Sequence, residues 1–564
     1  MGPTLPISEE IHATKYRQEG ESFKEAMTRV ADALKDNDEH FNSFREILLE
    51  QRFLPAGRVQ AAMGAVREVT PYNCFVSCTI EDSMDGIMEA AKRAAQTMRL
   101  GGGIGYDFST IRPSKDLIKS LDSQASGPVS FMGIFDAVCR TIASAGHRRG
   151  AQMGVLRVDH PDIEEFIRAK HNTDNLTAFN VSVAITDDFM EAVERKAKFP
   201  LKFDGIVYKI VDAWSLWEEI MRSTWDWAEP GVLLVDRIND ENNLWYCEDI
   251  AATNPCGEQP LPPNGACLLG SFNMVKYLKD GWKQGQKEID YQQFAQDIKH
   301  VVRAMDNVID RAEYPLKEQE EEAKSKRRMG LGVTGVANCI EALGFPYGSE
   351  VYIRYQNHIL QILRDTAYYA SADLAKEKGS FPKFDAANFL ASGFCMKLPP
   401  LLKQYIKRHG IRNSHLTSIA PTGTISLAAD NISSGIEPVF SLTYDRHIQT
   451  TSGPITEQVQ DYGYRVFGTR GKTADKCTPE EHVAVLNSAA YYVDSAVSKT
   501  CNIGDDVSFQ DFKEVYWRAY KGGAKGCTTF RAAGKRMGVL VKKDEDEAQA
   551  CRYDPETGIR TCDE

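Results

Sequence analysis

The sequence predicts a large α/β protein, and two observations support this. Short apolar runs such as AQMGVLRV (151–158) and NVSVAI (180–185) have the length of buried strands, and segments with helical periodicity alternate with them. Of the 564 residues, 42% are hydrophobic and 26% are charged, which is the composition of a globular protein with a large core. We therefore expect strands and helices to alternate along most of the chain.

The first elements are predicted to be helices. Residues 5–52 have a charged helical pattern. A clear helix follows Cys74, because Asp82 and Ser83 can cap its start and apolar residues then recur on one face. Those residues are Met84, Ile87, Met88, Ala91, Ala95 and Met98. The helix should end at the glycine run 101–105, and a second apolar helix should cover 130–144.

Further along, residues 212–379 have a mostly helical pattern. The stretch SHLTSIAPTGTISLAAD (414–430) predicts a strand, a tight turn and a helix. After Leu540 the segment VKKDEDEAQA has nothing to bury and predicts a flexible linker. We expect three parts: a helical N-terminal region (1–70), a catalytic domain (71–535) and a flexible C-terminal tail (536–564).

Charge and hydropathy exclude two classes of partner. The net charge of -12 argues against a non-specific nucleic-acid coat, which needs a basic surface. No apolar run approaches the ~20 residues that span a bilayer, and the first twenty residues lack the apolar core of a signal peptide. We expect a cytoplasmic protein that binds neither nucleic acid nor membrane, with its thirteen cysteines mostly reduced.

The cysteines do not predict a metal site. No C-x-x-C occurs, and Cys74 and Cys78 are four residues apart with no paired histidines at finger spacing. We interpret Cys139, Cys339 and Cys395 as small buried apolar groups.

Two glycine-rich motifs are misleading. GLGVTG (330–335) matches the dinucleotide fingerprint, but a charged segment precedes it where an apolar strand is required. We expect its glycines to permit tight turning and close packing. GTRGKT (468–473) resembles a phosphate loop, but Val466 occupies the position of the first required glycine.

The segment APTGTIS (420–426) is a better phosphate site. Gly423 would let the backbone turn sharply, and Thr422, Thr424 and Ser426 would supply hydroxyl donors. Free amides at the start of a helix also favour an anion. An ordinary capped turn would have the same pattern, so the residues alone leave both readings open.

An irregular segment, TNPCGEQPLPPNGAC (253–267), contains a second kind of chemistry. It fits neither a helix nor a strand period. No histidine lies nearby to activate Cys256, and the carboxylate of Glu258 would raise rather than lower the pKa of a neighbouring thiol. A neutral thiol suits hydrogen-atom transfer by a sulfur radical, so we expect that use rather than attack as an anion.

At this point six motifs, spread over residues 54–531, together resemble the catalytic chain of a ribonucleotide reductase. The motifs are NPCGEQPLPPNGAC, NCFVSCTIEDSMDGI, GGGIGYDF, RRGAQMGVLRVDHPDIEEFI, RRMGLGVTG and APTGTIS. The resemblance implies a ten-stranded α/β barrel whose central finger loop carries the radical cysteine. It also implies conversion of ribonucleotides to 2′-deoxyribonucleotides.

The resemblance assigns roles to residues. Cys256 would form the thiyl radical, Glu258 would be the general base, and Asn254 would hydrogen-bond the substrate hydroxyls. Cys74 and Cys267 would supply two electrons and end as a disulfide.

Other sites follow from the same resemblance. Cys78 is the rival to Cys74 as the redox partner of Cys267. The substrate phosphates would bind at the turn made of Pro421, Thr422, Gly423, Thr424 and Ser426. A deoxynucleoside triphosphate or ATP effector would bind at Asp82, Ser83, Arg112 and the loop from Lys170 to Phe179, although the first two would also serve as helix caps. The two apolar helices nearby would form the face of a homodimer.

The residues at the position of a tyrosine pair found in some members of the family indicate the source of the radical. Members of the family that receive the radical from a metal subunit relay it through adjacent tyrosines, but KGCTTFR (525–531) has Thr528, Thr529 and Phe530 at the matching place. This segment resembles the adenosylcobalamin-dependent class. Three alternatives stay open: a chain that needs a separate metal subunit, a non-catalytic nucleotide sensor, and a thiol-based metal-binding or structural protein.

The tail predicts a redox shuttle. Cys551 and Cys562 would reduce the internal disulfide and would themselves be reduced by thioredoxin or a glutaredoxin-like protein, through thiol–disulfide exchange. The intervening YDPETG is rich in turn formers, so a hairpin would bring the two sulfurs together.

Overall fold

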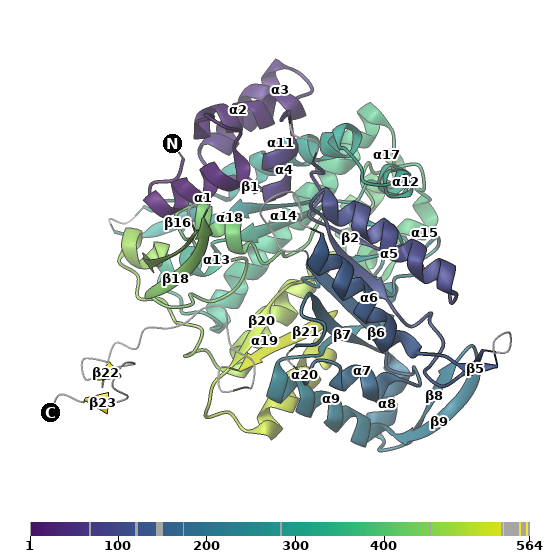
Figure 1. The fold of residues 1–564 in the computed structure, drawn as a ribbon. Helices are drawn as coiled ribbons and strands as arrows, with labels where there is room; N and C mark the ends of the chain where they lie inside the picture. The colour runs from purple at the N-terminus through teal and green to yellow at the C-terminus, as the bar shows by residue number, and fades with distance from the viewer. Residues whose placement is uncertain are drawn as a thin grey trace.

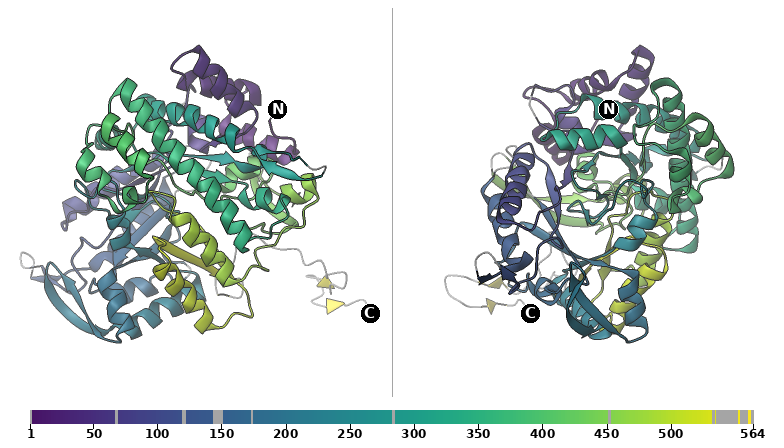
Figure 2. Two further views of the ribbon diagram at one scale, coloured as in Figure 1. Left: turned by 180° about the vertical axis from the view of Figure 1, so that it is seen from behind. Right: turned by 90° about the vertical axis from the view of Figure 1, so that its right-hand side faces the viewer.

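The chain is an α/β protein, as the sequence predicts (Figure 1). Its structure is a computed structural model, which describes residues 2–66, 69–118, 122–142, 151–172, 174–282, 285–450, 453–531, 534, 552–553 and 560–561. Two larger sheets and several hairpins are surrounded by helices (Figure 2). None of the helices in the described ranges is long and apolar enough to cross a membrane.

The larger sheet has eight strands in the order β13-β2-β3-β6-β7-β10-β21-β20. Five neighbouring strands run parallel, which requires crossover connections between them. These are β2 (Cys74–Val76), β3 (Gly103–Asp107), β6 (Gln152–Arg157), β7 (Phe179–Ile185) and β10 (Gly231–Leu234). The direction then reverses, because β10 pairs antiparallel with β21 (Gly526–Arg531), and β21 pairs parallel with β20 (Thr500–Ile503).

The smaller sheet contains β1 (Phe53–Pro55), β14 (Leu269–Asn273) and β17 (Gly330–Thr334) in the order β1-β14-β17. Strands β14 and β17 run parallel. Single parallel bridges continue from β17, first between Leu331 and Thr417 and then between Ile419 and Val497. The strand predicted at 414–419 is therefore present only as isolated bridges.

Helices surround both sheets and pack in two large hydrophobic cores, and the core of the smaller sheet also includes Phe75, Met153 and Leu233 of the larger one. The helices packed in the other core are α5 (Met84–Arg99), α6 (Gly127–Thr141), α7 (Ile163–Arg168), α8 (Asp187–Glu194), α9 (Ala213–Trp227) and α20 (Phe509–Lys521). Those in the core of the smaller sheet include α10 (Val235–Asp240), α11 (Tyr291–Arg311), α13 (Val336–Ala342), α14 (Glu350–Lys378), α15 (Ala386–Leu390), α16 (Gly393–Met396) and α17 (Pro400–His409). Helix α19 (Pro479–Ala490) contributes to both cores.

Residues 212–379 are less helical than predicted. Between α9 and α11, residues 231–289 contain β10 to β16, the short helix α10, one 3-10 turn (Met274–Tyr277) and connecting loops. The short strands here are β11 (Ala252–Thr253), β12 (Pro260–Leu261), β13 (Ala266–Cys267), β15 (Leu278–Asp280) and β16 (Lys287–Ile289). The remaining hairpins are β4 (Leu117–Ile118) with β5 (Ser123–Gln124), β8 (Lys198–Phe203) with β9 (Ile206–Asp212), β18 (Thr443–Thr450) with β19 (Gly453–Gln460), and β22 (Arg552–Tyr553) with β23 (Arg560–Thr561).

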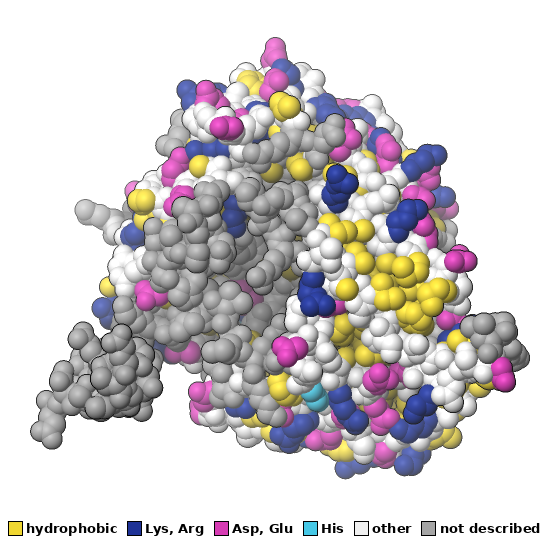
Figure 3. All heavy atoms as spheres, viewed as in Figure 1, with side chains coloured by type: hydrophobic (Ala, Val, Ile, Leu, Met, Phe, Trp, Pro, Cys, Tyr) yellow, Lys and Arg dark blue, Asp and Glu magenta, His cyan; other side chains and the backbone are white. Residues whose placement is uncertain are grey.

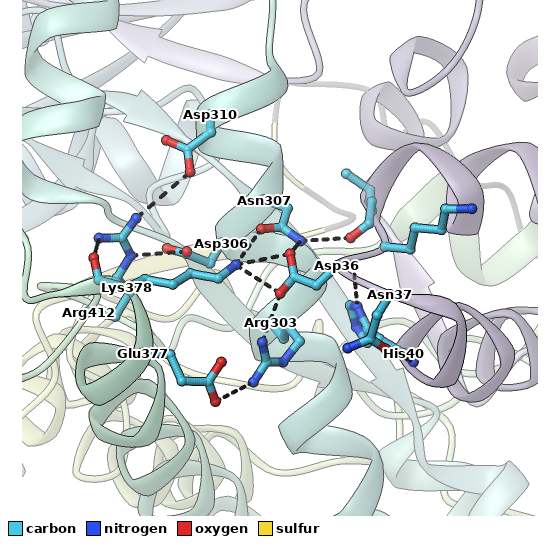
Figure 4. A network of polar contacts seen from close by, with 12 residues as sticks. Asp36, Asn37, His40, Arg303, Asp306, Asn307, Asp310, Glu377, Lys378 and Arg412 are labelled. Carbon is cyan, nitrogen blue, oxygen red and sulfur yellow. Dashed lines mark hydrogen bonds and ion pairs between the residues drawn. The ribbon is translucent and has the colours of Figure 1, made fainter.

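The first part of the chain is helical, as predicted, with α1 (Pro6–Tyr16), α2 (Phe23–Leu34), α3 (Asp38–Leu49) and α4 (Gly57–Ala62). A polar network joins the α2–α3 connection to α11 and α14 (Figure 4). Asp36 forms ion pairs with Arg303 at 2.8 Å and with Lys378 at 2.9 Å. Burial alone would raise the pKa of Asp36, but hydrogen bonds from Lys378, Arg303 and Asn307 outweigh it and hold that pKa well below its usual range.

The GLGVTG motif is not a dinucleotide fingerprint. Gly330 and Gly332 lie within the buried strand β17, which follows the charged helix α12 (Lys317–Lys326). A Cβ on Gly332 would lie 2.3 Å from Ser418 O, so this position requires glycine for close packing. The turn is made by Gly335 alone, at φ +70° before α13.

Candidate active site

The irregular loop that carries Cys256 lies between the two sheets. On one side, Gly105 of β3 approaches it so closely that a Cβ would lie 1.8 Å from Thr253 O, and Asn180 Nδ2 of β7 donates to Pro255 O at 3.1 Å. On the other side, Glu258 O accepts hydrogen bonds from Ser418 Oγ and Ala496 N, both at 2.9 Å. The loop is thus held from both sheets.

Cys256 occupies the tip of this loop. It is exposed, and together with Pro255 and Gly257 it lines a cavity of about 260 Å³. Gly257 has φ +82°, a conformation that glycine adopts without strain. Its N–H donates to Asn254 O at 3.1 Å, which closes the turn under the thiol.

Asn254 and Glu258 flank the thiol and are buried, at 0% and 2% exposure. Asn254 Oδ1 accepts the N–H of Gln259 at 3.0 Å, which fixes the orientation of the side-chain amide. Asn254 Nδ2 is buried and has no partner within the described residues. Buried donors are normally satisfied, so this amide is suited to donate to a bound ligand.

Cys74 and Cys267 are brought together by strand pairing. They are direct partners in the antiparallel register of β13 and β2, and such partners have Cα atoms about 4.5–5.5 Å apart, a range that also suits a disulfide. Burial raises the pKa of the Cys267 thiol well above its ordinary value, and the charges of Cys74, Glu258 and Cys256 act in the same direction. The four groups therefore lie in one neighbourhood.

Cys78 lies elsewhere. It packs against the core of the larger sheet, and its charge acts on the pKa of Tyr106, which burial already raises well above the usual value. The strand register thus favours Cys74 as the partner of Cys267. Periodicity in the sequence could not distinguish the two, because the choice depends on which residue pairs with β13.

The turn at Pro421–Ser426 is built differently from the prediction. Thr422, not Gly423, has the left-handed backbone, at φ +51°, and α18 (Gly423–Ala428) follows it. The hydroxyl of Thr422 contacts those of Thr334 and Ser426, each at 2.9 Å, and accepts the N–H of Gly435 at 2.8 Å. These three contacts fix the Thr422 side chain and so support its left-handed backbone conformation.

Thr424 lies within α18 and is partly exposed. Pro421 lines the cavity of Cys256, whereas Gly423 lines a second cavity of about 540 Å³. The two cavities share Ala228, Thr500 and Thr528 as lining residues. The turn therefore contributes to both the Cys256 cavity and the second cavity.

The second cavity is bordered by strand β21. Thr528, Thr529 and Phe530 line it, together with Asn431, Ser433 and other residues from the region after α18. Thr528 and Thr529 carry small side chains, and Thr528 also lines the cavity of Cys256.

Lys499 was not predicted from the sequence. It lines the cavity of Cys256 and donates to Glu437 Oε2 at 2.7 Å. Its Nζ also lies 3.0 Å from His482 Nδ1. Burial, followed by the Lys499 charge, lowers the pKa of His482 to about 2, so the ring is neutral and can accept this hydrogen bond. No local motif marks such a lysine, since its partners come from distant segments.

The predicted effector residues form two separate groups. Arg112 Nε donates to Asp82 Oδ2 at 2.7 Å, while Ser83 is the N-cap of α5 and accepts from Gly86 N at 3.0 Å. Ser83 thus confirms the predicted cap, whereas the carboxylate of Asp82 is paired with an arginine.

Lys170 and Phe179 are joined at the base of their loop. The ammonium group of Lys170 donates to Phe179 O and forms an ion pair with Glu229 at 2.8 Å. Glu229 lines the Cys256 cavity, and Asn180, directly after the loop, contacts Pro255. The base of this loop is therefore connected to the loop of Cys256, which the sequence does not reveal.

The tail cysteines, Cys551 and Cys562, lie outside the described residues. Their neighbours are described: Arg552 pairs with Thr561, and Tyr553 pairs with Arg560, in antiparallel register. This pairing agrees with the hairpin predicted from YDPETG.

Comparison with known proteins decides the family. The model of the ribonucleotide reductase barrel domain matches residues 72–530, most of the chain and the part that contains the site described above. The chain belongs to the ribonucleotide reductase family. This confirms the resemblance that the six motifs indicate.

Curated relatives of this family cover most of the chain. The "Vitamin B12-dependent ribonucleoside-diphosphate reductase" of Thermoplasma acidophilum is 33% identical over 96% of this chain and 72% of its own length. The protein of that name from Mycobacterium tuberculosis is 35% identical over 83% of this chain and 68% of its own length. The "Vitamin B12-dependent ribonucleotide reductase" of Streptomyces avermitilis is 29% identical over 97% of this chain and 64% of its own length.

Proposed function

We propose that this chain reduces ribonucleotides to 2′-deoxyribonucleotides by thiyl-radical chemistry at Cys256. The observation that carries this proposal is the direct pairing of Cys74 with Cys267 beside the loop of Cys256 and Glu258. A sensor that only bound nucleotides would not need two opposed thiols and a carboxylate next to an exposed cysteine. The family match supports the same conclusion.

The residues would act in sequence. The Cys256 radical takes the hydrogen atom from C3′ of the ribose, and Glu258 accepts the proton of the 3′ hydroxyl while Asn254 hydrogen-bonds the substrate hydroxyls. The 2′ hydroxyl leaves as water. Cys74 and Cys267 then supply two electrons and two protons and become a disulfide, and Cys256 returns a hydrogen atom to C3′. A positioned base such as Glu258 typically contributes about 100- to 10,000-fold in rate.

The cofactor we propose is adenosylcobalamin, on the names of the relatives and on the shape of the site. When bound, it supplies the radical by homolysis of its cobalt–carbon bond. The second cavity would suit a bulky group, because it adjoins the Cys256 cavity through Ala228, Thr500 and Thr528 and the side chains of Thr528 and Thr529 are small. Within this chain, Thr528, Phe530, Asn431 and Ser433 would hold the cofactor.

We also propose that the sheets close into the ten-stranded barrel implied by the family. Two sets of five parallel segments support this: β2, β3, β6, β7 and β10 in one, and β14, β17, the 417–419 segment, the 497–503 segment and β21 in the other. The sets meet antiparallel at β10 and β21. At the other edge, β13 pairs antiparallel with β2 and leads directly into β14. On this arrangement the Cys256 loop is the finger inside the barrel, and 71–535 is the catalytic domain between the helical region 1–70 and the tail 536–564.

Substrate and effector would bind at separate places. The turn Pro421–Ser426 would hold the substrate phosphates, since Pro421 lines the Cys256 cavity. Arg112 and Asp82 would hold a nucleoside triphosphate effector, with the loop Lys170–Phe179 carrying the signal through Glu229 and Asn180.

A homodimer would form through α5 and α6. Apolar side chains gather over these helices on the surface (Figure 3). Met84 is 61% exposed and Met88 is 47% exposed, although both belong to the apolar stripe predicted for α5. A contiguous exposed apolar patch of this kind marks an interaction site.

Turnover in the cytoplasm would require a reductant. A disulfide between Cys74 and Cys267 would be poorly accessible from outside, because Cys267 is fully buried. We propose that the tail, through Cys551 and Cys562, carries electrons to it from thioredoxin or a glutaredoxin-like protein.

The test is a reconstitution from purified components. Protein, adenosylcobalamin, a small dithiol and a ribonucleoside diphosphate should yield deoxyribonucleotide with no second protein, and Cys256→Ala should yield none while still binding substrate. Activity that appears only after an iron or manganese subunit is added would assign the chain to the other class. Product from Cys256→Ala would remove this thiol from the mechanism.

A further inference from the structure

The first helix lies against the outer side of the phosphate turn. Ile7 and Ile11 of α1 share a buried cluster with Leu427 and Ala428 of α18. Ser8 Oγ donates to Leu427 O at 2.6 Å, and this contact is buried. The same carbonyl also accepts Asn431 N at 3.3 Å, so it links the end of α18 both to α1 and to the residues that follow.

A buried carboxylate completes the contact. Asp430, two residues beyond α18, is 3% exposed. Its Oδ1 accepts the N–H groups of Thr4 at 2.6 Å and Leu5 at 3.0 Å, and its Oδ2 accepts the hydroxyl of Thr4 at 2.9 Å. Leu5 is the N-cap of α1 and has no capping side chain of its own. Asp430 therefore accepts the two amides that directly precede α1, and a negative charge at that end of the helix is favourable.

The turn needs support of this kind. Helix α18 has six residues, which is too short to be stable without tertiary contacts. Thr422 is β-branched and has φ +51°, a conformation that persists only where the surroundings enforce it. Thr334 supports the inner side through its hydroxyl, and α1 supports the outer side.

We propose that α1 and Asp430 form a brace that holds the turn Pro421–Ser426 in the shape that binds substrate phosphates. Asp430 is a positioning residue: it contacts Thr4 and Leu5 rather than substrate. This inference rests on the proposed function, because the brace serves the substrate phosphates. It assigns a role in substrate affinity to a helix that no motif connects with the active site.

The test uses two variants that loosen the brace from opposite sides. Ser8→Ala removes the donor to Leu427 O, and Asp430→Asn removes the charge while keeping a residue that tolerates the left-handed φ of +64°. Each should raise KM for a ribonucleoside diphosphate by about 3- to 10-fold, as expected for the loss of one buried hydrogen bond. The value of kcat at saturating substrate should stay within about two-fold, since the thiol and base are untouched.

A binding measurement separates the brace from the reductase activity. Isothermal titration of inorganic pyrophosphate needs neither cofactor nor radical, and its affinity should fall by the same factor as KM rises. Asp36→Asn is the matched control, because it loosens the helical region at the network of Figure 4, away from α18. It should leave both KM and the pyrophosphate affinity unchanged.

Three outcomes would overturn the brace. The first is an unchanged KM and pyrophosphate affinity in both variants. The second is a rise in KM in Asp36→Asn as large as that in the two brace variants. The third is a wild-type protein that binds no pyrophosphate. If the wild type binds pyrophosphate but makes no deoxyribonucleotide, the proposed function fails while the affinity comparison still decides the brace. Ser8→Ala keeps the test decisive even if Asp430→Asn does not fold.

Discussion

The sharpest prediction comes from the close approach of strand β3 to the loop of Cys256. Gly105→Ala would place a Cβ 1.8 Å from Thr253 O, where ordinary contact begins at 3.4 Å. The loop must therefore move by the difference, about 1.6 Å, unless β3 moves instead. A misplacement of about 1 Å can cost about 100-fold in rate when reacting groups must be aligned. We expect kcat to fall at least that far, because Asn254, Cys256 and Glu258 all follow Thr253 directly.

Gly154→Ala is the matched control for this substitution. Gly154 lies on the neighbouring strand β6, opposite Tyr106, and its Cβ would meet Met132 Cε at 2.7 Å. That contact is with the end of a flexible side chain, which can turn away, so kcat should be retained. The assay is deoxyribonucleotide formation with adenosylcobalamin and a small dithiol, with circular dichroism and thermal unfolding on both variants. A folded Gly105→Ala protein with the wild-type kcat would refute the claim that β3 sets the position of the loop.

Three further predictions concern the base, the tail and a buried carboxyl. Glu258→Gln should lower kcat by about 100- to 10,000-fold with little change in substrate affinity, and an unchanged kcat in steady-state assays would make Glu258 structural. Replacement of both Cys551 and Cys562 by Ser should abolish turnover driven by thioredoxin but largely preserve turnover driven by a small dithiol; wild-type rates with thioredoxin alone would exclude the shuttle. Burial raises the pKa of Glu341 from 4.5 to about 7, so the folded state holds a proton that the unfolded chain releases. The free energy of unfolding should therefore fall as the pH rises through this window, and Glu341→Gln should flatten that dependence in denaturant titrations.

Local signals predicted the outer elements well. Ser83 caps α5 because a hydroxyl before an amphipathic run satisfies a free amide, and that rule needs only a few neighbouring residues. The strands at 152–157 and 179–185 followed from short apolar runs. The exposure of Met84 and Met88 could not be predicted, because an apolar stripe does not reveal which part of it faces the core.

Features that depend on tertiary packing were predicted wrongly from the sequence or could not be predicted at all. Gly423 was the expected turning residue, yet Thr422 turns, because hydroxyls from Thr334 and Ser426 hold it in place. The stretch 231–289 was assigned to a helical region, but it forms the short strands that lead to the loop of Cys256.

By itself, the sequence determined the α/β class and the family, and it singled out Cys256 and Glu258 as the thiol and carboxylate of the proposed chemistry. These features depend on residue identity and on spacing within a few turns of chain. Only the tertiary structure decided that Cys74 rather than Cys78 opposes Cys267, and that the loop is held by Gly105 and Asn180. Those contacts join segments far apart in sequence. Strand register and the close approach of backbones fix them, and no local pattern encodes either one.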